Sequence, residues 1–334
     1  MKRLNWLNQC YLRENYERDS EIIGDNNLLG DLDIFRYGTV LLFQFMLKIL
    51  VTGGAGFIGS HIAERCVKDG HEVHIIDDFS TGRMSNVIDF FGKVEVFSED
   101  VRTFEPKEKY DVIFHVAARA SIPESIKNPV LSNDYNVGGI LRVLEIARET
   151  GAIVIFSSSS SVGQTPITPY ALQKRIGEDY MRLYSEFYSV RGVALRYFNV
   201  FGERQETANG GYCLVLSRFL DQKKNGKPFT IYGTGEQRRD FIYVGDVVEA
   251  SLKAFEYIKD VTFHDGFGFE IFNIGSGENV SVNELADLID KKHPREKLSP
   301  RVEPFEMLAD IRRTKKELGW SPQVPLKEWL SHQL

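Results

Sequence analysis

The chain has 334 residues, which is long enough for one large domain or two moderate ones with a sizeable core. Its formal net charge of −6 argues against a nucleic-acid or anionic-membrane partner, because both favour basic surfaces. The three cysteines lie far apart and no Cys or His cluster has zinc-site spacing, so we expect free thiols, a cytoplasmic location and no metal site.

The N-terminal segment 1–45 does not share the pattern of the sequence that follows it. It is polar and uneven, and it precedes Met46, a natural start for the first strand. The apolar stretch 39–51 is interrupted by Gln44 and Lys48, and it is shorter than the roughly 20 apolar residues of a membrane-spanning helix. The segment also lacks the pattern of a signal peptide. We predict a soluble protein with an N-terminal extension of unknown role.

Short apolar runs rich in β-branched residues alternate with segments of helical periodicity from residue 48 onward. The runs read KILVT, EVHIID, DVIFHVA, AIVIFS and VALRYF. This alternation predicts an α/β fold in which helices cover both faces of a doubly wound parallel sheet. Runs that are apolar throughout suit strands buried on both sides. Two predicted helices end at Gly70 and Gly151, because glycine readily terminates a helix.

A glycine-rich turn joins the first predicted strand to the first predicted helix. Gly53, Gly56 and Gly59 suit a tight turn, close approach of a pyrophosphate to the backbone, and close packing of helix on strand. The pyrophosphate would bind at the helix N-terminus, where free N–H groups favour negative charge. The next strand ends in Asp77, whose carboxylate would bind the adenosine ribose and repel a 2′-phosphate. A turn that only packs is the alternative, but this context favours a Rossmann-type site for NAD.

A run of five serines, residues 157–161, ends the fourth of these apolar runs, and Tyr170 and Lys174 follow it four residues apart. In a helix their side chains share one face. A lysine ammonium and the positive nicotinamide ring would lower the tyrosine pKa from its usual value of about 10. The alternative is an ordinary amphipathic helix with a surface lysine. The dinucleotide motif upstream favours a tyrosine base, with a serine hydroxyl bonded to the same substrate oxygen.

The regular alternation weakens around residue 200, where the loops become longer and richer in Gly and Asn. We therefore assign residues 46–200 to an NAD-binding Rossmann domain. Residues 201–334 would form mainly a smaller α/β part that binds the substrate. Within it, Ser281 and Glu284 have the spacing of a capping box at the start of a helix.

From residue 46 to its end the chain resembles the extended short-chain dehydrogenase/reductase family. Within that family it is most similar to the nucleotide-sugar epimerases that act on UDP-glucose and UDP-galactose. The resemblance rests on separate stretches, among them KILVTGGAGFIGSH, VIFHVAARASIPES, NDYNVGGILRVLE, YALQK, LRYFNVFG and GEQRRDFIYVGDVVEA. It implies NAD as the cofactor, a UDP-linked substrate, and a homodimer that associates through a helical face.

The resemblance also implies a role for individual residues. The implied catalytic set is Ser159, Tyr170 and Lys174. The implied cofactor-binding set is Gly53, Gly56, Phe57, Ile58, Gly59, Asp77, Asp100, Val101, Ala117, Ala118, Asn136, Tyr170, Lys174 and Tyr197. The implied substrate-binding set is Phe198, Asn199, Arg239 and Arg301, with Arg239 at the diphosphate.

The reaction implied by the resemblance is epimerisation at C4 by transient oxidation. Tyr170 would take the proton of the 4-hydroxyl while hydride passes from C4 to NAD. The 4-keto sugar would then turn and receive the hydride on its other face. Met307, at a position that limits N-acetylated sugars in the family, implies partial tolerance of UDP-N-acetyl sugars because methionine is flexible.

Residues 157–161 are all Ser, so they lack the acidic residues that the related dehydratases and decarboxylases carry after this strand. That difference favours epimerisation. The connection from these serines to Tyr170 is short and lacks the tyrosine of the family's VYG stretch, so the sugar stays open. The alternatives are an epimerase with another substrate, a dehydratase, and a non-catalytic NAD-binding protein.

Overall fold

A parallel sheet of seven strands forms the centre of the larger part of the molecule. The computed structural model describes residues 46–163, 168–205, 214–260, 268–301 and 303–333, so the predicted extension 1–45 lies outside the described part. The strands are β1 (Lys48–Thr52), β2 (Glu72–Ile76), β3 (Val94–Phe97), β4 (Val112–His115), β5 (Ile153–Ser159), β6 (Gly192–Tyr197) and β10 (Phe269–Ile274). Five of them coincide with the five predicted runs to within two residues, which confirms the predicted α/β fold.

The order of the strands creates a site at one edge of this sheet. The order is β10-β6-β5-β4-β1-β2-β3. Along the chain, β2 and β3 are added on one side of β1, and β4, β5, β6 and β10 are then added in turn on its other side. At such a reversal the loops after two neighbouring strands diverge and leave a crevice at the carboxyl ends of the strands. The glycine turn after β1 and the loop after β4 therefore border one crevice.

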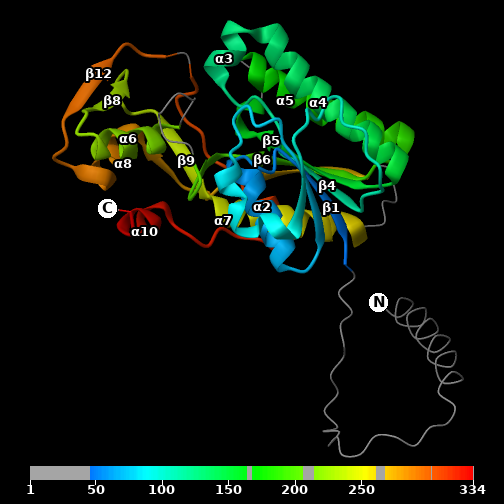
Figure 1. Cartoon of the computed structure of the whole chain (residues 1–334). Coiled ribbons are helices and arrows are strands. Elements are labelled where there is room, and N and C mark those ends of the chain that lie inside the picture. The colour runs from blue at the N-terminus through cyan, green and yellow to red at the C-terminus, as the bar shows by residue number, and fades with distance from the viewer. Residues whose placement is uncertain (1–45, 164–167, 206–213, 261–267, 302, 334) are drawn as a thin grey trace, which may run out of the picture. The chain divides into compact units, whose positions relative to one another are not determined.

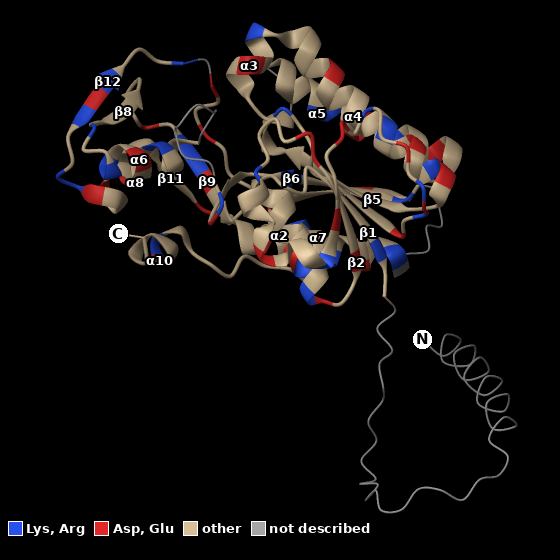
Figure 2. Ribbon diagram, in the orientation of Figure 1, with Lys and Arg blue, Asp and Glu red and all other residues tan. Residues whose placement is uncertain are grey.

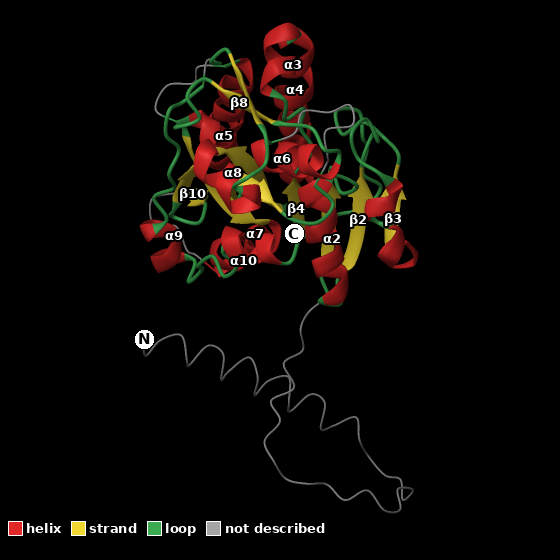
Figure 3. Cartoon of the chain, turned by 90° about the vertical axis from the view of Figure 1, so that its left-hand side faces the viewer, coloured by secondary structure: helices red, strands yellow, loops and turns green. Residues whose placement is uncertain are grey.

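Helices cover both faces of the sheet, as Figures 1 and 3 show. On one face, α2 (Phe57–Lys68) and α7 (Val244–Asp260) share an apolar core with the strands. On the other face, α4 (Pro129–Thr150) and α5 (Pro169–Tyr188) share a second core, and α3 (Ile122–Lys127) packs beside them. Burial of both faces explains why the strands are apolar throughout.

The two predicted helix ends are confirmed. Gly70 follows α2 with φ +85°, and Gly151 caps α4 with φ +81°, a left-handed backbone conformation that glycine adopts without strain. Three short 3₁₀ helices lie in the connections: η1 (Met84–Asn86), η2 (Ile88–Lys93) and η3 (Ser160–Val162).

A smaller part of the molecule lies at the carboxyl edge of the large sheet and has its own core. Its elements are β7 (Asn199–Phe201), α6 (Val215–Lys224), β8 (Phe229–Tyr232), β9 (Arg238–Tyr243), β11 (Asn279–Ser281), α8 (Val282–Asp290), β12 (Arg295–Leu298) and α10 (Leu326–Ser331). The rings of Phe219 and Phe229 stack in this core with their centroids 4.6 Å apart. The predicted capping box of Ser281 and Glu284 is present at the start of α8.

The chain crosses between the two parts more than once. After residue 200, α7 and β10 return to the large sheet, and α9 (Arg312–Glu317) packs near β10. The predicted limits 46–200 and 201–334 stay a prediction. The repeated crossings tie the smaller part of the molecule to the large sheet.

Charged residues of both signs are interspersed over the outer helices and loops in Figure 2. No helix in the described ranges is both long and apolar enough to cross a membrane. Cys66 is a free, buried thiol, and burial raises its pKa to about 12, so it has little thiolate character. The cytoplasmic location stays a prediction.

Candidate active site

One cleft at the carboxyl edge of the large sheet gathers most of the predicted site residues. Its volume is about 470 Å³, in the range of small-molecule sites. The lining residues predicted as site residues are Gly56, Phe57, Ile58, Ala118, Ser159, Tyr170, Lys174, Tyr197, Phe198, Asn199 and Arg239. They come from both parts of the molecule, so a ligand in this cleft would contact both.

The glycine turn forms one wall of the cleft at the start of α2. Gly53 has φ +68°, and a Cβ there would lie 2.8 Å from the backbone of Ala117. A Cβ on Gly59 would overlap the carbonyl oxygen of Gly53. Only glycine therefore permits this close packing, and the resulting turn presents the N-terminus of α2 to the cleft through Gly56, Phe57 and Ile58.

Asp77 follows β2 beside this turn and is buried. Its carboxylate accepts hydrogen bonds from the backbone N–H groups of Ala55 and Phe79, both at 2.9 Å. Burial raises the pKa of Asp77, and the backbone hydrogen bonds oppose that rise. A carboxylate has about four acceptor positions, so two hydrogen bonds leave capacity for ribose hydroxyls. The glycine turn and Asp77 together fit NAD.

The loop after β4 is held beside the glycine turn by a buried threonine and histidine. The Thr52 hydroxyl bonds His115 Nδ1 at 2.7 Å and accepts from the N–H of Ala117 at 3.3 Å. Burial, with a smaller effect from Lys174, lowers the pKa of His115 to about 3. A neutral His115 thus holds Thr52, which in turn fixes the position of Ala117 against the glycine turn.

Asn136 lies behind the loop that follows β4 rather than in the cleft lining. Its Oδ1 accepts from the N–H of Arg119 at 2.8 Å, and its Nδ2 donates to Gln173 Oε1 at 2.8 Å. Asn136 therefore joins that loop to α5. The predicted adenine neighbours Asp100 and Val101 also lie outside the lining, and Asp100 forms an ion pair with Arg102.

The predicted catalytic residues lie together where β5 meets α5. Thr168 caps α5 by accepting from the N–H of Ala171 at 3.2 Å, which sets the start of the helix just before Tyr170. Tyr170 and Lys174 then share a buried face, with Lys174 Nζ 5.9 Å from the centroid of the Tyr170 ring. Ser159 projects from the end of β5, and its hydroxyl bonds that of Ser161 at 2.8 Å.

Lys174 is almost completely buried, with 4% of its surface exposed. Its Nζ donates to the carbonyl oxygen of Ser157 at 2.7 Å. Burial lowers the pKa of Lys174 to about 7, and the nearby carboxylate of Glu178 acts in the opposite direction. Lys174 therefore keeps its positive charge near neutral pH only where neighbouring groups stabilise the ammonium form.

Three other predicted site residues in the cleft lining, Tyr197, Asn199 and Arg239, come from β6, β7 and β9. The Tyr197 hydroxyl bonds Ser251 Oγ at 2.9 Å, and Asn199 Nδ2 donates to the carbonyl oxygen of Asp240 at 2.8 Å. Arg239 is buried and forms an ion pair with Glu303 at 2.6 Å. A buried guanidinium at this position suits an anionic group such as a diphosphate.

Some placements were not evident from the sequence. Arg301 does not line the cleft; its guanidinium lies 3.4 Å from the centroid of the Tyr232 ring, in a stacking contact. Glu303 and Ser161 line the cleft, although sequence analysis did not single them out. The serine run was a signal for Ser161. No spacing marked Glu303, because its partner Arg239 is distant in the sequence.

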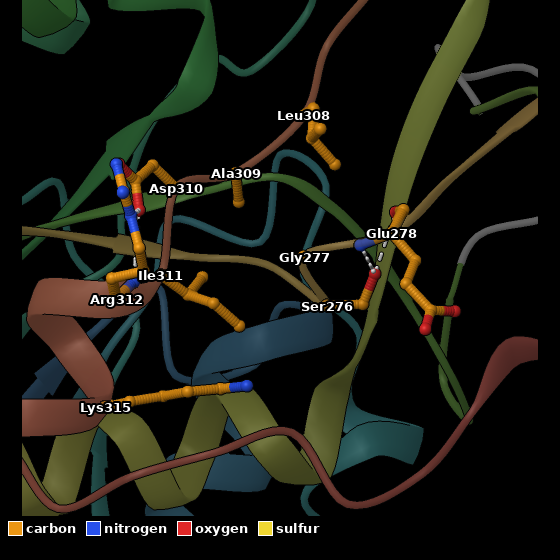
Figure 4. Close-up of a pocket in the computed structure, with 9 residues that line it drawn as sticks. All are labelled: Ser276, Gly277, Glu278, Leu308, Ala309, Asp310, Ile311, Arg312 and Lys315. Carbon is orange, nitrogen blue, oxygen red and sulfur yellow. Dashed lines mark hydrogen bonds and ion pairs between the residues drawn. The ribbon is translucent and has the colours of Figure 1, made fainter.

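A second, more open hollow lies beside residues 308–312, and Figure 4 shows it in close-up. Its lining consists of Ser276, Gly277, Glu278, Leu308, Ala309, Asp310, Ile311, Arg312 and Lys315. The carboxylate of Asp310 pairs with Arg312, and the Ser276 hydroxyl donates to the carbonyl oxygen of Glu278. Because these polar groups bond one another, the cleft that gathers the predicted site residues is the better candidate. Within the described ranges, no group of three His, Cys, Asp or Glu side chains could hold a metal ion.

Comparison with known proteins gives consistent matches over most of the chain. The model of the NAD dependent epimerase/dehydratase family matches residues 49–275. A putative UDP-glucose 4-epimerase of Methanocaldococcus jannaschii is 37% identical over 312 residues, covering 84% of this chain and 95% of that protein.

Solved structures with similar folds extend these matches. UDP-N-acetylglucosamine 4-epimerase from Methanobrevibacter ruminantium, in complex with UDP-N-acetylmuramic acid, matches with a TM-score of 0.79 at 32% identity, covering 86% of this chain and 97% of that one. UDP-glucuronic acid 4-epimerase from Bacillus cereus, in complex with UDP-glucuronic acid and NAD, matches with a TM-score of 0.76 at 29% identity, covering 86% and 98%. The match in each case includes both parts of the fold.

Substituting Gly59→Ala should weaken NAD binding by about tenfold or more, which corresponds to roughly 1.4 kcal/mol. The added methyl group would overlap the carbonyl oxygen of Gly53 and force the turn away from α2. Isothermal titration with NAD measures the change. Gly92→Ala is the matched control, because nothing lies within 4 Å of a Cβ there. Equal NAD affinity in the two variants would contradict this account of the turn.

Lys174→Met should stabilise the protein at neutral and lower pH, with a gain that shrinks as pH rises. The folded pKa is lowered to about 7, whereas an unfolded lysine titrates near 10.4, roughly. Below pH 7 both states carry the proton, so the folded state bears the full cost of the buried charge. Between about pH 7 and 10 the unfolded state binds more protons, and stability rises with pH.

Urea unfolding at about pH 6 and pH 10 measures this effect, with an expected gain on the order of a few kcal/mol at the lower pH. Lys316→Met, on the exposed side of α9, is the control and should show no such dependence. A gain that is the same at both pH values would mean that the ammonium of Lys174 is not what burial penalises.

Proposed function

The chain belongs to the NAD-dependent epimerase/dehydratase family, and on that basis we propose that it epimerises a UDP-sugar at C4 by transient oxidation. The observation that carries this proposal is the group of Ser159, Tyr170 and Lys174, which lines the same cleft as the glycine turn. NAD is the cofactor of the family, and the residues of this cleft fit it. When bound, NAD supplies the hydride acceptor that oxidation at C4 requires and returns the hydride afterwards.

In the proposed reaction Tyr170 removes the proton of the sugar 4-hydroxyl. An ammonium group close to a phenol favours the phenolate, so Lys174 would lower the Tyr170 pKa toward the working pH. Lys174 is suited to this role because its Nζ is held at Ser157 and lies near the Tyr170 ring. Ser159 would donate its hydroxyl hydrogen bond to the same sugar oxygen, since its Oγ already accepts from the N–H of Ser161 at 3.2 Å.

The substrate would be anchored at its diphosphate and left free at its sugar. Arg239 and Asn199 lie on the smaller part of the molecule and line the same cleft as Tyr170. Inversion at C4 requires the keto sugar to present its other face to the same hydride donor. A single strong anchor at the diphosphate permits that rotation, whereas tight contacts around the sugar ring would oppose it.

The sugar is proposed to be of the UDP-glucose and UDP-galactose type. The similarity to a putative UDP-glucose 4-epimerase supports this choice. The alternative is another nucleotide-sugar enzyme of the same scaffold, supported by the similarity to epimerases named for UDP-N-acetylglucosamine and UDP-glucuronic acid. Met307 lines the cleft, which supports a role for this flexible side chain in the choice between plain and N-acetylated sugars. The absence of acidic residues at 157–161 favours epimerisation over elimination.

A homodimer through the outer face of α4 and α5 is also proposed. This face exposes apolar side chains that a monomer would leave in water: Val130 is 83% exposed, Leu131 50%, Leu172 51%, Leu183 44% and Phe187 68%. Leu183 and Phe187 stand one turn apart on α5 and form part of one stripe. Exposed apolar residues gathered on neighbouring helices favour a protein interface.

Incubation of the protein with UDP-galactose should produce the anomeric proton signal of UDP-glucose, with no 4-keto-6-deoxy product. Tyr170→Phe should retain NAD but lower the rate by at least about 100-fold, because general acid–base catalysis typically contributes that much. Proton NMR measures the products and rates. Tyr188→Phe, at the C-terminal end of the same helix, is the control and should keep the parent rate.

Full activity of Tyr170→Phe would exclude Tyr170 as the base. An active protein that converts only another UDP-sugar would keep the family assignment and correct the substrate. No turnover of any nucleotide sugar, with NAD still bound, would favour the non-catalytic alternative.

Phe187→Glu should convert the dimer to a monomer, because a carboxylate would be buried at the apolar face. Sedimentation velocity distinguishes the two states. Phe91→Glu is the control, since Phe91 is 46% exposed on η2, away from α4 and α5. A parent protein that sediments as a monomer would contradict the proposed association.

A further inference from the structure

Glu178 lies one helical turn beyond Lys174 on α5 and is more deeply buried than the lysine. Only 1% of Glu178 is exposed. A carboxylate is rarely buried so deeply without a function or a full set of partners, because desolvation of the charge is costly. Neither the glycine turn nor the proposed proton transfer accounts for it. It faces the strand that ends in Ser159.

The partners of Glu178 come from two adjacent strands. Ser158 on β5 donates its hydroxyl to Oε1 at 2.6 Å. Arg196 on β6 donates from Nε to Oε1 at 2.8 Å and from Nη2 to Oε2 at 2.6 Å. Ser158 and Arg196 are register partners in the sheet, so both reach the carboxylate from one position along the strands. A bidentate arginine contact is among the stronger charge-assisted arrangements and fixes the carboxylate in place.

Lys174 and Glu178 hold consecutive residues of the serine strand. Lys174 Nζ bonds the carbonyl oxygen of Ser157, and Glu178 bonds the hydroxyl of Ser158. The residue that follows is Ser159, which faces the cleft. Two successive turns of α5 therefore fix the end of β5 just before the predicted catalytic serine.

We propose that Glu178 is a positioning residue that keeps Lys174 charged in its buried site and holds the serine strand against α5. This inference rests on the proposed function, because the charge of Lys174 would affect catalysis by lowering the pKa of Tyr170. With Lys174, Glu178 and Arg196 all ionised, the cluster carries one net positive charge. That charge lies next to the phenol that has to ionise.

The titratable groups around Lys174 come from three elements. They are Tyr170 and Glu178 on α5, His115 on β4, and Arg196 and Tyr197 on β6. His115 is neutral at physiological pH, since burial keeps its pKa at about 3. Burial raises the pKa of Tyr197, which is therefore neutral as well. Glu178 is thus the anion among these groups that can offset the loss of hydration at Lys174.

Direct titration of Lys174 in the NAD-bound protein tests the proposal without any sugar. Lysine labelled with ¹³C at Cε gives a signal whose position reports the charge of each side chain, and Lys174→Met identifies the signal of Lys174. In Glu178→Gln the midpoint should move to lower pH by about one pH unit or more, because the neighbouring negative charge is lost. Glu178→Asp keeps the charge and should restore most of the midpoint.

Ser158→Ala is the matched control, because it removes a hydrogen bond of Glu178 but leaves every charge in place. Its midpoint should equal that of the parent, while kcat should fall with KM little changed because the serine strand is less firmly held. Equal midpoints in Glu178→Gln and the parent would overturn the proposal. An equal shift in Glu178→Gln and Ser158→Ala would also overturn it, since loosening rather than charge would then be the cause.

Glu178→Gln leaves Arg196 without its carboxylate and can impair folding. The double variant Glu178→Gln with Arg196→Met is compared with Arg196→Met alone, so that only the charge of Glu178 differs between the two proteins: a lower Lys174 midpoint in the double variant supports the proposal, and equal midpoints overturn it. A lowered midpoint in a protein that turns over no nucleotide sugar would refute the proposed function while leaving the role of Glu178 intact.

Discussion

Burying the ammonium group of Lys174 beneath a strand is unfavourable, and the surrounding elements are arranged to offset that cost. The carbonyl oxygen of Ser157 accepts its hydrogen bond, and Glu178 supplies an opposing charge from the next turn of α5. Because the charge is desolvated, its effect on a neighbouring phenol is larger than it would be in water. In the proposed reaction Ser158 and Arg196 would contribute through the hydrogen bonds that they donate to Glu178.

The order of the strands determines which groups share the cleft. The reversal between β1 and β4 opens a crevice in which the glycine turn, Asp77 and the loop after β4 fit a dinucleotide. The chain then crosses to the smaller part and back, which brings Arg239 of β9 into the lining of the same cleft. The large sheet carries the residues that fit the cofactor, and a separate core carries Arg239, which would bind the diphosphate. This division suits a reaction in which the sugar turns between two steps.

Local patterns were sufficient to predict much of the fold and the closeness of Tyr170 and Lys174 on one helix face. Apolar runs, glycine positions and the four-residue spacing of Tyr170 and Lys174 each depend on a few neighbouring residues. The return of β10 to the large sheet, the pairing of Arg239 with Glu303 and the contact of Ser158 with Glu178 depend instead on strand order and register. Arg301, predicted to contact the nucleotide, stacks on Tyr232 because β8 brings that ring beside it.

The measurement that tests the central claim most directly follows deuterium placed at C4 of UDP-galactose during its conversion in ordinary water. Epimerisation by transient oxidation predicts that UDP-glucose appears with deuterium still at C4, because the same hydride leaves and returns within the cleft. Deuterium and proton NMR detect both the label and the configuration of the product. Loss of the label to solvent, or a product whose C6 has been reduced to a methyl group, would contradict the account.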